Sequence, residues 1–282
     1  MAIVFDGIKF AKKKEEKLKL AVKKLKIKPK LVVVLVGDSP ASQLYVRKKK
    51  EAAERVGIEF ELKKFKKSAS EQAIIGFIKK KNGEKAATGI IVQLPLPKKF
   101  NEIKIRRVIN SDKDVDCLHQ NNLGLLMMGK PVYMPAAVKA VLEIILIAVT
   151  PPRSASAHLA GVTISERLRG KNVVIVGGGN LVGKPLAMVL SNLGATVTIC
   201  RSPTLDLAKH SREADILVSA VGKQSLITKE MIKKGAVVID VGEKGDVKKD
   251  VVQTASFIAL VPGGVGPMTV VSLLGNMVEL AS

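Results

Sequence analysis

The sequence predicts an α/β protein of two domains, and three observations support this fold class. Short runs of β-branched and aliphatic residues, such as Leu31–Val36 and Val173–Val176, are typical of buried strands. Longer segments of helical periodicity separate these runs, an alternation that forms parallel sheets with helices on their faces. The length of 282 residues allows two domains or one large one, and 47% hydrophobic residues support a sizeable core.

The first half of the chain has a clear order of elements. Apolar residues recur at helical intervals among the lysines of residues 8–25, and the turn GDSPAS ends the first buried strand. We expect Ser42 to cap the helix after this turn, and Ser68 or Ser70 to begin a later one. The expected elements are a helix at 8–25, a strand at 31–36, a helix from 42 to about 56, a strand at 60–65, a helix at 70–81, a strand at 89–93 and an apolar helix at 136–149.

The second half is organised around residues 173–182, which read VVIVGGGNLV. A strand expected at 172–176 runs into three glycines, and Gly183 then opens a helix expected at 184–193. The spacing GxGxxxG is a variant of the dinucleotide fingerprint, whose glycines let backbone N–H groups approach a pyrophosphate at a helix N-terminus. A glycine-rich turn of any α/β protein is the alternative. The remaining expected elements are strands at 196–200, 216–220 and 237–241 and a helix at 269–280.

Polar clusters near strand ends indicate a site, because ligands of parallel sheets bind beyond the carboxyl ends of the strands. The clusters are residues 37–49, 93–97 and 112–116. Tyr45 and Lys49 are spaced i, i+4 and share one helix face, although composition alone cannot select Lys49 from the run of four cations, 47–50, that contains it. Gln93 offers an amide at a strand end. Asp116 can accept two hydrogen bonds from an amino-pyrimidine edge.

The composition bounds the partners and the compartment. The 47 Lys and Arg against 25 Asp and Glu give a formal charge of +22, which attracts polyanions. With 3% aromatic residues and no Trp, few rings could stack on nucleic-acid bases. The positive charge therefore indicates either an acidic small substrate or simply a solvated basic surface. Cys117 and Cys200 have no disulfide or metal-ligand spacing, so we expect a reducing cytoplasm and no metal. With no signal peptide and no apolar run of spanning length, we expect a soluble protein.

Four motifs together resemble the methylenetetrahydrofolate dehydrogenase/cyclohydrolase family. They are SQLYVRKK at 42–49, VQLPLP at 92–97, KDVD at 113–116 and PGGVGPMT at 262–269. They occur in the family's order, with the dinucleotide fingerprint between the last two, and the resemblance runs from about Asp6 to the C-terminus. It implies NADP-dependent oxidation of 5,10-methylenetetrahydrofolate to the 5,10-methenyl form, followed by hydrolysis to 10-formyltetrahydrofolate. The setting that it implies is one-carbon metabolism and purine biosynthesis, in a cytoplasmic homodimer.

The resemblance also implies a role for individual residues. Lys49 would be the general acid/base, with a pKa lowered toward neutrality, and Gln93 would hydrogen-bond it and hold its orientation. Tyr45 would stack on the folate ring system, and Asp116 would hold the amino-pyrimidine edge of the pterin. The further substrate-binding residues are Pro262, Gly263 and Gly264. The cofactor-binding residues are Gly177, Gly178, Gly179, Val182, Gly183, Arg201, Ser202 and Thr269.

The end of the second strand of the nucleotide unit favours NADP over NAD. NAD-selective sites carry an acid there, whereas this chain has Arg201 and Ser202, a cation and a hydroxyl that suit a 2′-phosphate. The family commonly reads GRS where this chain has glycines at 177–179, so an arginine that helps bind the phosphate is missing. NAD therefore remains the second candidate.

The resemblance implies two domains with a cleft between them. A catalytic, folate-binding domain would take residues 1–147, with the C-terminal helix 268–282 packed back on it, and a Rossmann-type domain would take 148–267. The stretch 150–161, which contains a surface histidine (His158), resembles an insertion. Other departures from the family are PAA at 135–137, Cys117 where glycine is usual, and Glu243 with Lys244.

Polyglutamate tails on the folate substrate would give the basic surface an acidic partner, and we expect neither nucleic acid nor a membrane as a partner. Two alternatives stay open. A monofunctional dehydrogenase would keep hydride transfer and lose hydrolysis. A basic nucleic-acid-binding protein with a vestigial nucleotide fold would use the charge of +22 instead.

Overall fold

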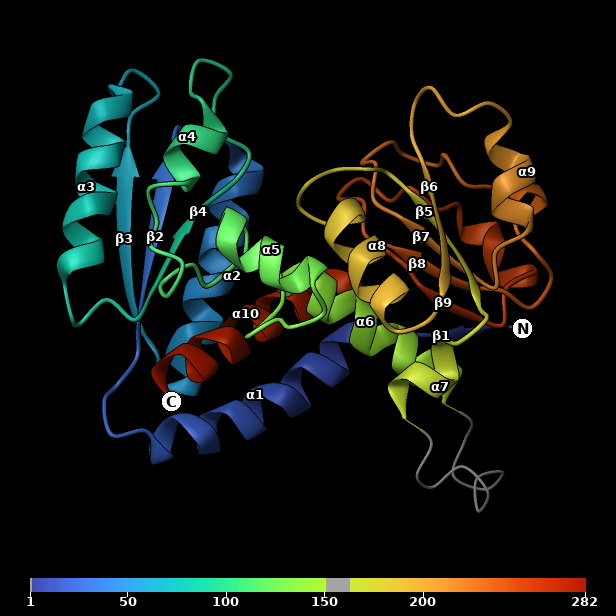
Figure 1. Cartoon of the computed structure of the whole chain (residues 1–282), viewed down its shortest axis with the longest axis horizontal. Coiled ribbons are helices and arrows are strands. Elements are labelled where there is room, and N and C mark those ends of the chain that lie inside the picture. Colours follow the sequence, from blue (N-terminus) through green and yellow to red (C-terminus); the bar gives the residue numbers. More distant parts are fainter. Residues whose placement is uncertain (1, 151–162) are drawn as a thin grey trace. The chain divides into compact units, whose positions relative to one another are not determined.

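The computed structural model describes residues 2–150 and 163–282, which form two compact units (Figure 1). Of the described residues, unit 1 contains 2–10, 126–130, 137–150 and 163–269, and unit 2 contains 11–125, 131–136 and 270–282. Each unit is built around its own parallel sheet, which confirms the predicted α/β class. Apart from Thr150, the stretch expected to be an insertion at 150–161, including His158, lies outside the described residues.

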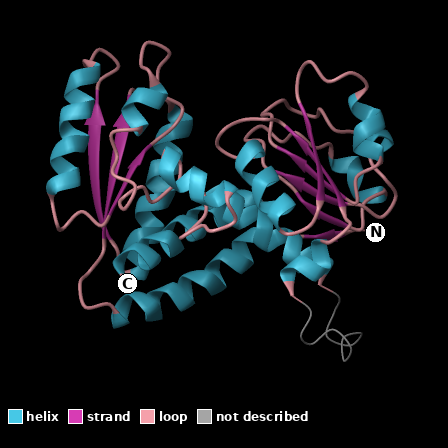
Figure 2. Cartoon of the chain, viewed as in Figure 1, coloured by secondary structure: helices cyan, strands magenta, loops and turns pink. Residues whose placement is uncertain are grey.

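Unit 2 has a three-stranded parallel sheet in the order β3–β2–β4. The strands, drawn in magenta in Figure 2, are β2 (Lys30–Val36), β3 (Glu59–Phe65) and β4 (Gly89–Val92). The helices that contribute to this unit are α1 (Gly7–Lys24), α2 (Pro40–Val56), α3 (Glu71–Gly83), α4 (Glu102–Arg106), α5 (Gln120–Met127) and α10 (Val265–Ala281).

The central strand β2 is buried on both faces, as its unbroken apolar sequence predicts. Leu31, Val33 and Leu35 pack with residues of α1, α2 and α10 on one face. Val32 and Val34 pack with α3 and α4 on the other. Successive side chains of a strand point to opposite faces, so each residue of the run reaches a core. Each fully buried side chain of this kind contributes about 1.5–3 kcal/mol of hydrophobic free energy.

Unit 1 has a six-stranded parallel sheet in the order β1–β9–β8–β7–β5–β6. The strands are β1 (Ile3–Val4), β5 (Asn172–Val176), β6 (Thr196–Cys200), β7 (Ile216–Ser219), β8 (Val237–Asp240) and β9 (Phe257–Ala259). The helical segments are α6 (Ala136–Val149), α7 (Ile164–Leu168), α8 (Gly183–Asn192), α9 (Leu207–Arg212), η2 (Lys229–Met231) and η3 (Lys249–Gln253). Strands β6 and β7 lie on opposite sides of β5, which makes the end of β5 a topological switch point, the usual ligand position of doubly wound sheets.

The structure corrects two of the expected boundaries and adds two strands. Helix α2 is capped by Ser39 rather than Ser42: the Ser39 side chain accepts from the Ser42 backbone N–H, and Pro40 fills the first turn, where a missing N–H costs nothing. Helix α10 begins at Val265 rather than 269, so the second half of the PGGVGPMT motif is helical. Strands β1 and β9 are absent from the sequence expectations, because two or three residues carry too little periodicity to be recognised.

The ends of the chain group with different units. Ile3 and Val4 pair with β9, so the first ten residues belong to unit 1, whereas the sequence analysis placed 1–147 in one domain. Residues 270–282 belong to unit 2. There the Asn276 side-chain amide donates to the carbonyls of Val115 and Met134.

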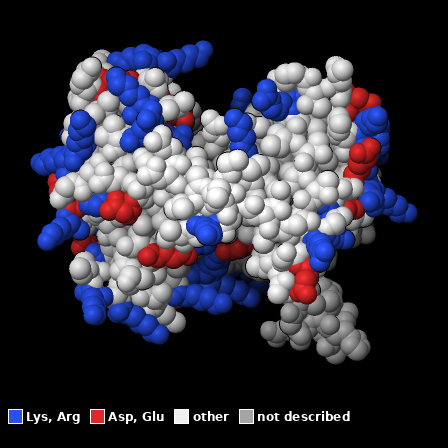
Figure 3. Space-filling model, in the orientation of Figure 1, with Lys and Arg blue, Asp and Glu red and all other residues white. Residues whose placement is uncertain are grey.

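The basic residues lie largely on the surface. Figure 3 shows Lys and Arg side chains along the edge of the molecule that Figure 1 assigns to α1, and Lys12, Lys13, Lys17 and Lys19 of that helix are exposed. Within residues 2–150 and 163–282, no helix has both the length and the apolar character needed to cross a membrane.

Candidate functional site

Helix α2 turns one cation of the run 47–50 inward. Its buried residues Ser42, Val46, Ala53 and Val56 form a stripe at helical spacing, and Lys49 falls on this stripe between Val46 and Ala53. Lys49 is therefore only partly exposed, while Arg47, Lys48 and Lys50 are exposed. The same periodicity was present in the sequence and is the signal that could have separated Lys49 from its neighbours.

The amine of Lys49 is held by a buried amide at the end of β4. Lys49 Nζ donates to Gln93 Oε1 at 3.0 Å, the hydrogen bond that the resemblance implied. Gln93 Nε2 donates to the carbonyl of Leu94 at 2.7 Å, and the Gln93 backbone N–H donates to Val34. These bonds fix the amide with its oxygen toward the amine, so Lys49 meets an acceptor that carries no charge.

Asp116 supplies the charge near this amine. The segment before it runs beside β4, where Ile90 N–H donates to the Lys113 carbonyl at 2.7 Å. Burial lowers the pKa of Lys49, and the nearby Asp116 carboxylate opposes that shift. Burial likewise raises the pKa of Asp116, against the attraction of Lys49. The pair therefore has an ammonium that gives up its proton more readily than a solvated lysine and a carboxyl group that takes one up more readily than a solvated aspartate.

A second acid, Asp114, was missed by the sequence analysis. Its Oδ2 accepts from the His119 backbone N–H at 2.6 Å and from Asn122 Nδ2 at 3.0 Å. Burial, reinforced by the charge of Asp116, raises the pKa of Asp114 to about 7. Asp114, Asp116 and His119 line one small pocket. The KDVD spacing, with two acids two residues apart, was the available signal.

Tyr45 lies on α2 one turn before Lys49 and is partly exposed, so helix geometry puts it on the same side of α2 as the amine. Lys49, Gln93, Asp116 and Tyr45 all belong to unit 2. The structure thus brings four predicted residues into one unit, with a direct contact between Lys49 and Gln93.

The glycine turn after β5 in unit 1 can hold a dinucleotide. Gly177 has φ of 116°, and a Cβ added there would lie 2.5 Å from the Ala220 carbonyl oxygen. A Cβ on Gly183 would collide with the Gly177 carbonyl, so both positions need glycine. Helix α8 starts at Gly183, and its N-cap Val182 makes no side-chain capping bond. In the first turn of α8, the Lys184 N–H donates to the Gly179 carbonyl and Pro185 has no N–H, so Gly183 offers the N–H that a pyrophosphate could accept from.

The remaining predicted residues of unit 1 lie beyond β6 and β9. Arg201 and Ser202 are exposed just after β6. Beyond β9, Pro262 is exposed, Gly263 has φ of 102°, and the Gly264 N–H donates to Leu260. Thr269 lies within α10, where its hydroxyl donates to the Val265 carbonyl at 3.1 Å. The carboxyl ends of the parallel strands thus carry the cofactor residues predicted after β5 and β6.

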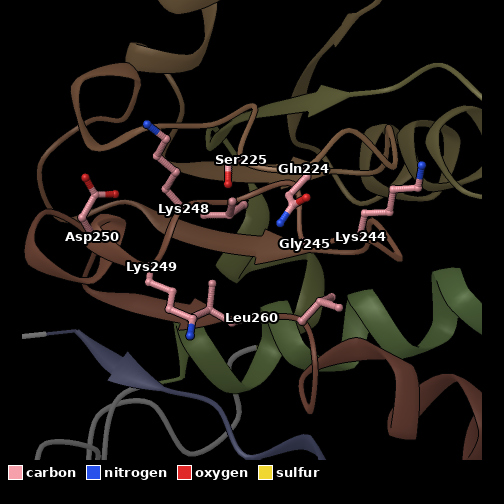
Figure 4. A pocket seen from close by; sticks show the side chains of 10 residues that line it. Gln224, Ser225, Lys244, Gly245, Lys248, Lys249, Asp250 and Leu260 are labelled. Atoms are coloured by element: carbon pink, nitrogen blue, oxygen red, sulfur yellow. The ribbon is translucent and has the colours of Figure 1, made fainter.

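A pocket of about 370 Å³ lies in unit 1 beside the loops that follow β7, β8 and β9 (Figure 4). In Figure 4, the amines of Lys244, Lys248 and Lys249 extend away from one another, so they do not converge on a single anion position. None of the predicted site residues lines this pocket.

Comparisons with known proteins cover both halves of the chain. Residues 5–116 match the family description "Tetrahydrofolate dehydrogenase/cyclohydrolase, catalytic domain", and residues 152–282 match "Tetrahydrofolate dehydrogenase/cyclohydrolase, NAD(P)-binding domain". The bifunctional protein FolD of an Exiguobacterium species is 42% identical, with 100% of this chain and 99% of the relative covered. That of Bacillus subtilis is 40% identical, with 99% and 98% covered.

Two solved structures share the fold of the whole chain. The bifunctional enzyme FolD from Campylobacter jejuni superposes with a TM-score of 0.90 at 35% identity, covering 100% of this chain and 99% of that one. The methylenetetrahydrofolate dehydrogenase-cyclohydrolase of Trypanosoma brucei, solved with NADP cofactor and an inhibitor, gives 0.89 at 34% identity, covering 99% and 97%.

Proposed function

The chain belongs to the tetrahydrofolate dehydrogenase/cyclohydrolase family, and we propose that Lys49 is its acid–base group. The enzyme oxidises 5,10-methylenetetrahydrofolate to 5,10-methenyltetrahydrofolate with NADP and hydrolyses that product to 10-formyltetrahydrofolate, two reactions of one-carbon metabolism. Bound NADP supplies the acceptor for the hydride that leaves the methylene carbon.

In the hydrolytic step, water adds to the cationic methenyl carbon and the carbon–N5 bond breaks as the formyl C=O forms. One proton of the water passes to N5, and the other is released to solvent. Lys49 in its neutral form takes the proton from the attacking water, and the resulting ammonium returns it to N5. The observation that carries this proposal is the 3.0 Å bond from Lys49 Nζ to Gln93 Oε1, with a lysine pKa that burial lowers. Gln93 positions the amine without a charge that would fix its proton.

Asp116 and Tyr45 would bind the substrate. We propose that the Asp116 carboxylate accepts hydrogen bonds from the amino-pyrimidine edge of the pterin and that the Tyr45 ring stacks on the pterin ring system. Support comes from the place of Asp116 beside Lys49 and from the helix face that Tyr45 shares with Lys49.

Replacing Lys49 by Met tests the acid–base role. We expect cyclohydrolase turnover to fall by about 10²–10⁴-fold, because methionine fills the space of the side chain but moves no proton. The affinity for NADP should stay unchanged. The exposed neighbour Lys48→Met is the matched control and should keep full turnover. Cyclohydrolase turnover of Lys49→Met equal to that of the wild type would remove Lys49 from the mechanism.

The same assay distinguishes the monofunctional alternative. The enzyme is supplied with methylenetetrahydrofolate and NADP, and the methenyl product is followed by its absorbance. A bifunctional enzyme forms the product and consumes it faster than the uncatalysed rate. A monofunctional dehydrogenase lets it accumulate.

Four finer features complete the proposal: a cytoplasmic location, a homodimer, polyglutamylated folate as substrate, and supply of formyl groups for purine biosynthesis. The buried free thiols of Cys117 and Cys200 fit a reducing compartment. The basic surface fits a polyanionic substrate tail. The homodimer and the link to purine synthesis rest on the family alone, and light scattering on the purified chain tests the first of these.

A further inference from the structure

The side chain of Arg201 lies across the glycine turn, over Gly178. We propose that Gly178 is a specificity-determining residue for NADP. Because Gly178 has no side chain, the Arg201 side chain can pack over the glycine turn, and from this position (here called the seat of Arg201) its guanidinium reaches the 2′-phosphate. This inference rests on the proposed use of NADP and extends it to a residue pair. Where the family's turn carries an arginine at 178, this chain supplies the guanidinium from the neighbouring strand.

The three glycines of the turn are glycines for different reasons. Gly177 needs its positive φ and its close approach to Ala220. A Cβ on Gly179 would meet nothing within 4 Å, so no neighbouring group excludes a side chain there. Gly178 has no positive φ, but a Cβ there would lie 2.7 Å from Arg201 Cδ and 3.1 Å from Arg201 Cγ. A side chain at 178 would therefore push the Arg201 side chain out of its present position.

The backbone of Arg201 is held by hydrogen bonds, while its guanidinium group stays available for a ligand. The Arg201 backbone N–H donates to Thr204 Oγ1 at 2.8 Å, and the Thr204 N–H donates back to the Arg201 carbonyl at 2.9 Å. Ile199, two residues earlier on β6, closes the seat with its Cγ2 at 3.3 Å from the same Cβ position. Among the described residues, no hydrogen bond or ion pair engages the Arg201 guanidinium, and the residue is exposed.

This position suits recognition of a phosphate on the adenosine ribose. The residue at the end of the second strand of a dinucleotide unit faces that ribose, and β6 is the second strand here. A guanidinium binds phosphate through two parallel hydrogen bonds. NAD has no phosphate at this point and gains nothing from the contact. Because a Cβ at residue 178 would overlap the present position of the Arg201 side chain, a side chain at 178 would move Arg201 away from the glycine turn.

The test measures dissociation constants of NADP and NAD by calorimetry on the full chain, with melting curves to show that each variant folds. We expect Arg201→Ala to weaken NADP binding by about tenfold or more, as loss of a charge-assisted bond does, and to change NAD binding little. Gly178→Ala should weaken NADP selectively, because the added methyl group displaces Arg201. Gly179→Ala is the matched control: any effect should fall equally on both cofactors, since both carry the pyrophosphate.

A double-variant cycle completes the test. Gly178→Ala should have no further effect on NADP binding once Arg201 is alanine, and Gly178→Arg combined with Arg201→Ala should regain NADP selectivity. The proposal is overturned if Gly178→Ala weakens both cofactors equally, or weakens NADP by the same factor with and without Arg201. If Arg201→Ala leaves NADP selectivity intact, Gly178 and Arg201 do not recognise the 2′-phosphate, although the enzyme still uses NADP. A wild type that binds NADP no better than NAD would contradict the cofactor assignment itself.

Discussion

At the scale of single residues, Cys117 in unit 2 has a backbone conformation that suits glycine better than cysteine. Cys117 has φ of 54°, in the left-handed region, where the family usually has glycine. Its N–H closes a turn to the Asp114 carbonyl, and its thiol donates to the Tyr133 carbonyl at 3.3 Å. Burial raises the pKa of this thiol, so it stays protonated and unreactive. This turn contains Asp116, and the chain forms it with a non-glycine residue in the left-handed region.

Comparison of Cys117→Gly with Cys117→Ala isolates that strain. Both variants lose the sulfur, so the difference between them reports the backbone alone. We expect the glycine variant to be more stable than the alanine variant by about 1 kcal/mol, because only alanine carries a Cβ into the left-handed region. Urea unfolding of the two proteins measures this difference. Equal stability, or a more stable alanine variant, would show that the turn relaxes.

At the scale of elements, two buried acids join the loops that follow β7 and β8. Asp246 Oδ2 accepts from Ser219 Oγ at 2.8 Å and from the Val221 N–H at 2.7 Å. Asp240 accepts from the backbone N–H groups of Gly242 and Val247. Burial raises the pKa of Asp240 from 3.8 to about 6, and the neighbouring Asp246 adds to the shift. The loops are therefore held by carboxylates that no described cation neutralises.

This arrangement predicts how the stability of unit 1 depends on pH. The folded state binds the Asp240 proton more tightly than the unfolded chain does, so its contribution to stability is greatest below about pH 4 and declines until about pH 6. The decline is at most about 1.4 kcal/mol per pH unit for one proton. Melting temperatures measured between pH 4 and pH 7 should show this slope for the wild type. Asp240→Asn should show a smaller slope than the wild type, with the remainder coming from Asp114, whose pKa burial also raises. An unchanged slope would show that Asp240 contributes nothing to it.

At the scale of the whole molecule, each unit has its own core and the surplus of positive charge is spread over the surface. The formal charge of +22 creates a field that would attract the polyanionic tail of the proposed substrate. Salt screens such a field: the Debye length falls from about 10 Å at 0.1 M to about 3 Å at 1 M ionic strength. A substrate with one carboxylate-bearing glutamate feels it less than one with a long tail.

The KM for a pentaglutamate form of methylenetetrahydrofolate should therefore rise several-fold more between 0.1 M and 1 M salt than the KM for the monoglutamate. Steady-state assays of both substrates at each salt concentration measure the two ratios. Equal ratios would mean that the charge serves something other than the substrate tail. Duplex DNA is a useful competitor in the same assay, because a nucleic-acid-binding protein would bind it tightly at low salt.

The sequence by itself determined the order of helices and strands and the glycine turn of the nucleotide unit. These follow from local rules: buried strands such as 31–36 need unbroken apolar runs, and Gly177 and Gly183 have no room for a side chain. The inward face of Lys49 was also encoded, as a position in the periodic stripe of α2. The two shortest strands, β1 and β9, were not recognisable, because two or three residues show no periodicity and β1 forms only by pairing with residues more than 250 positions away.

Only the tertiary structure decided which polar groups meet. The bond between Lys49 and Gln93 joins residues 44 positions apart, and the backbone N–H that donates to Asp114 comes from His119, in a turn that the sequence pattern does not mark. The seat of Arg201 on Gly178 required two neighbouring strands in register. Periodicity in the sequence predicts which face of an element a side chain occupies. The partner that the side chain meets on that face depends on how the elements pack, which is a property of the whole fold.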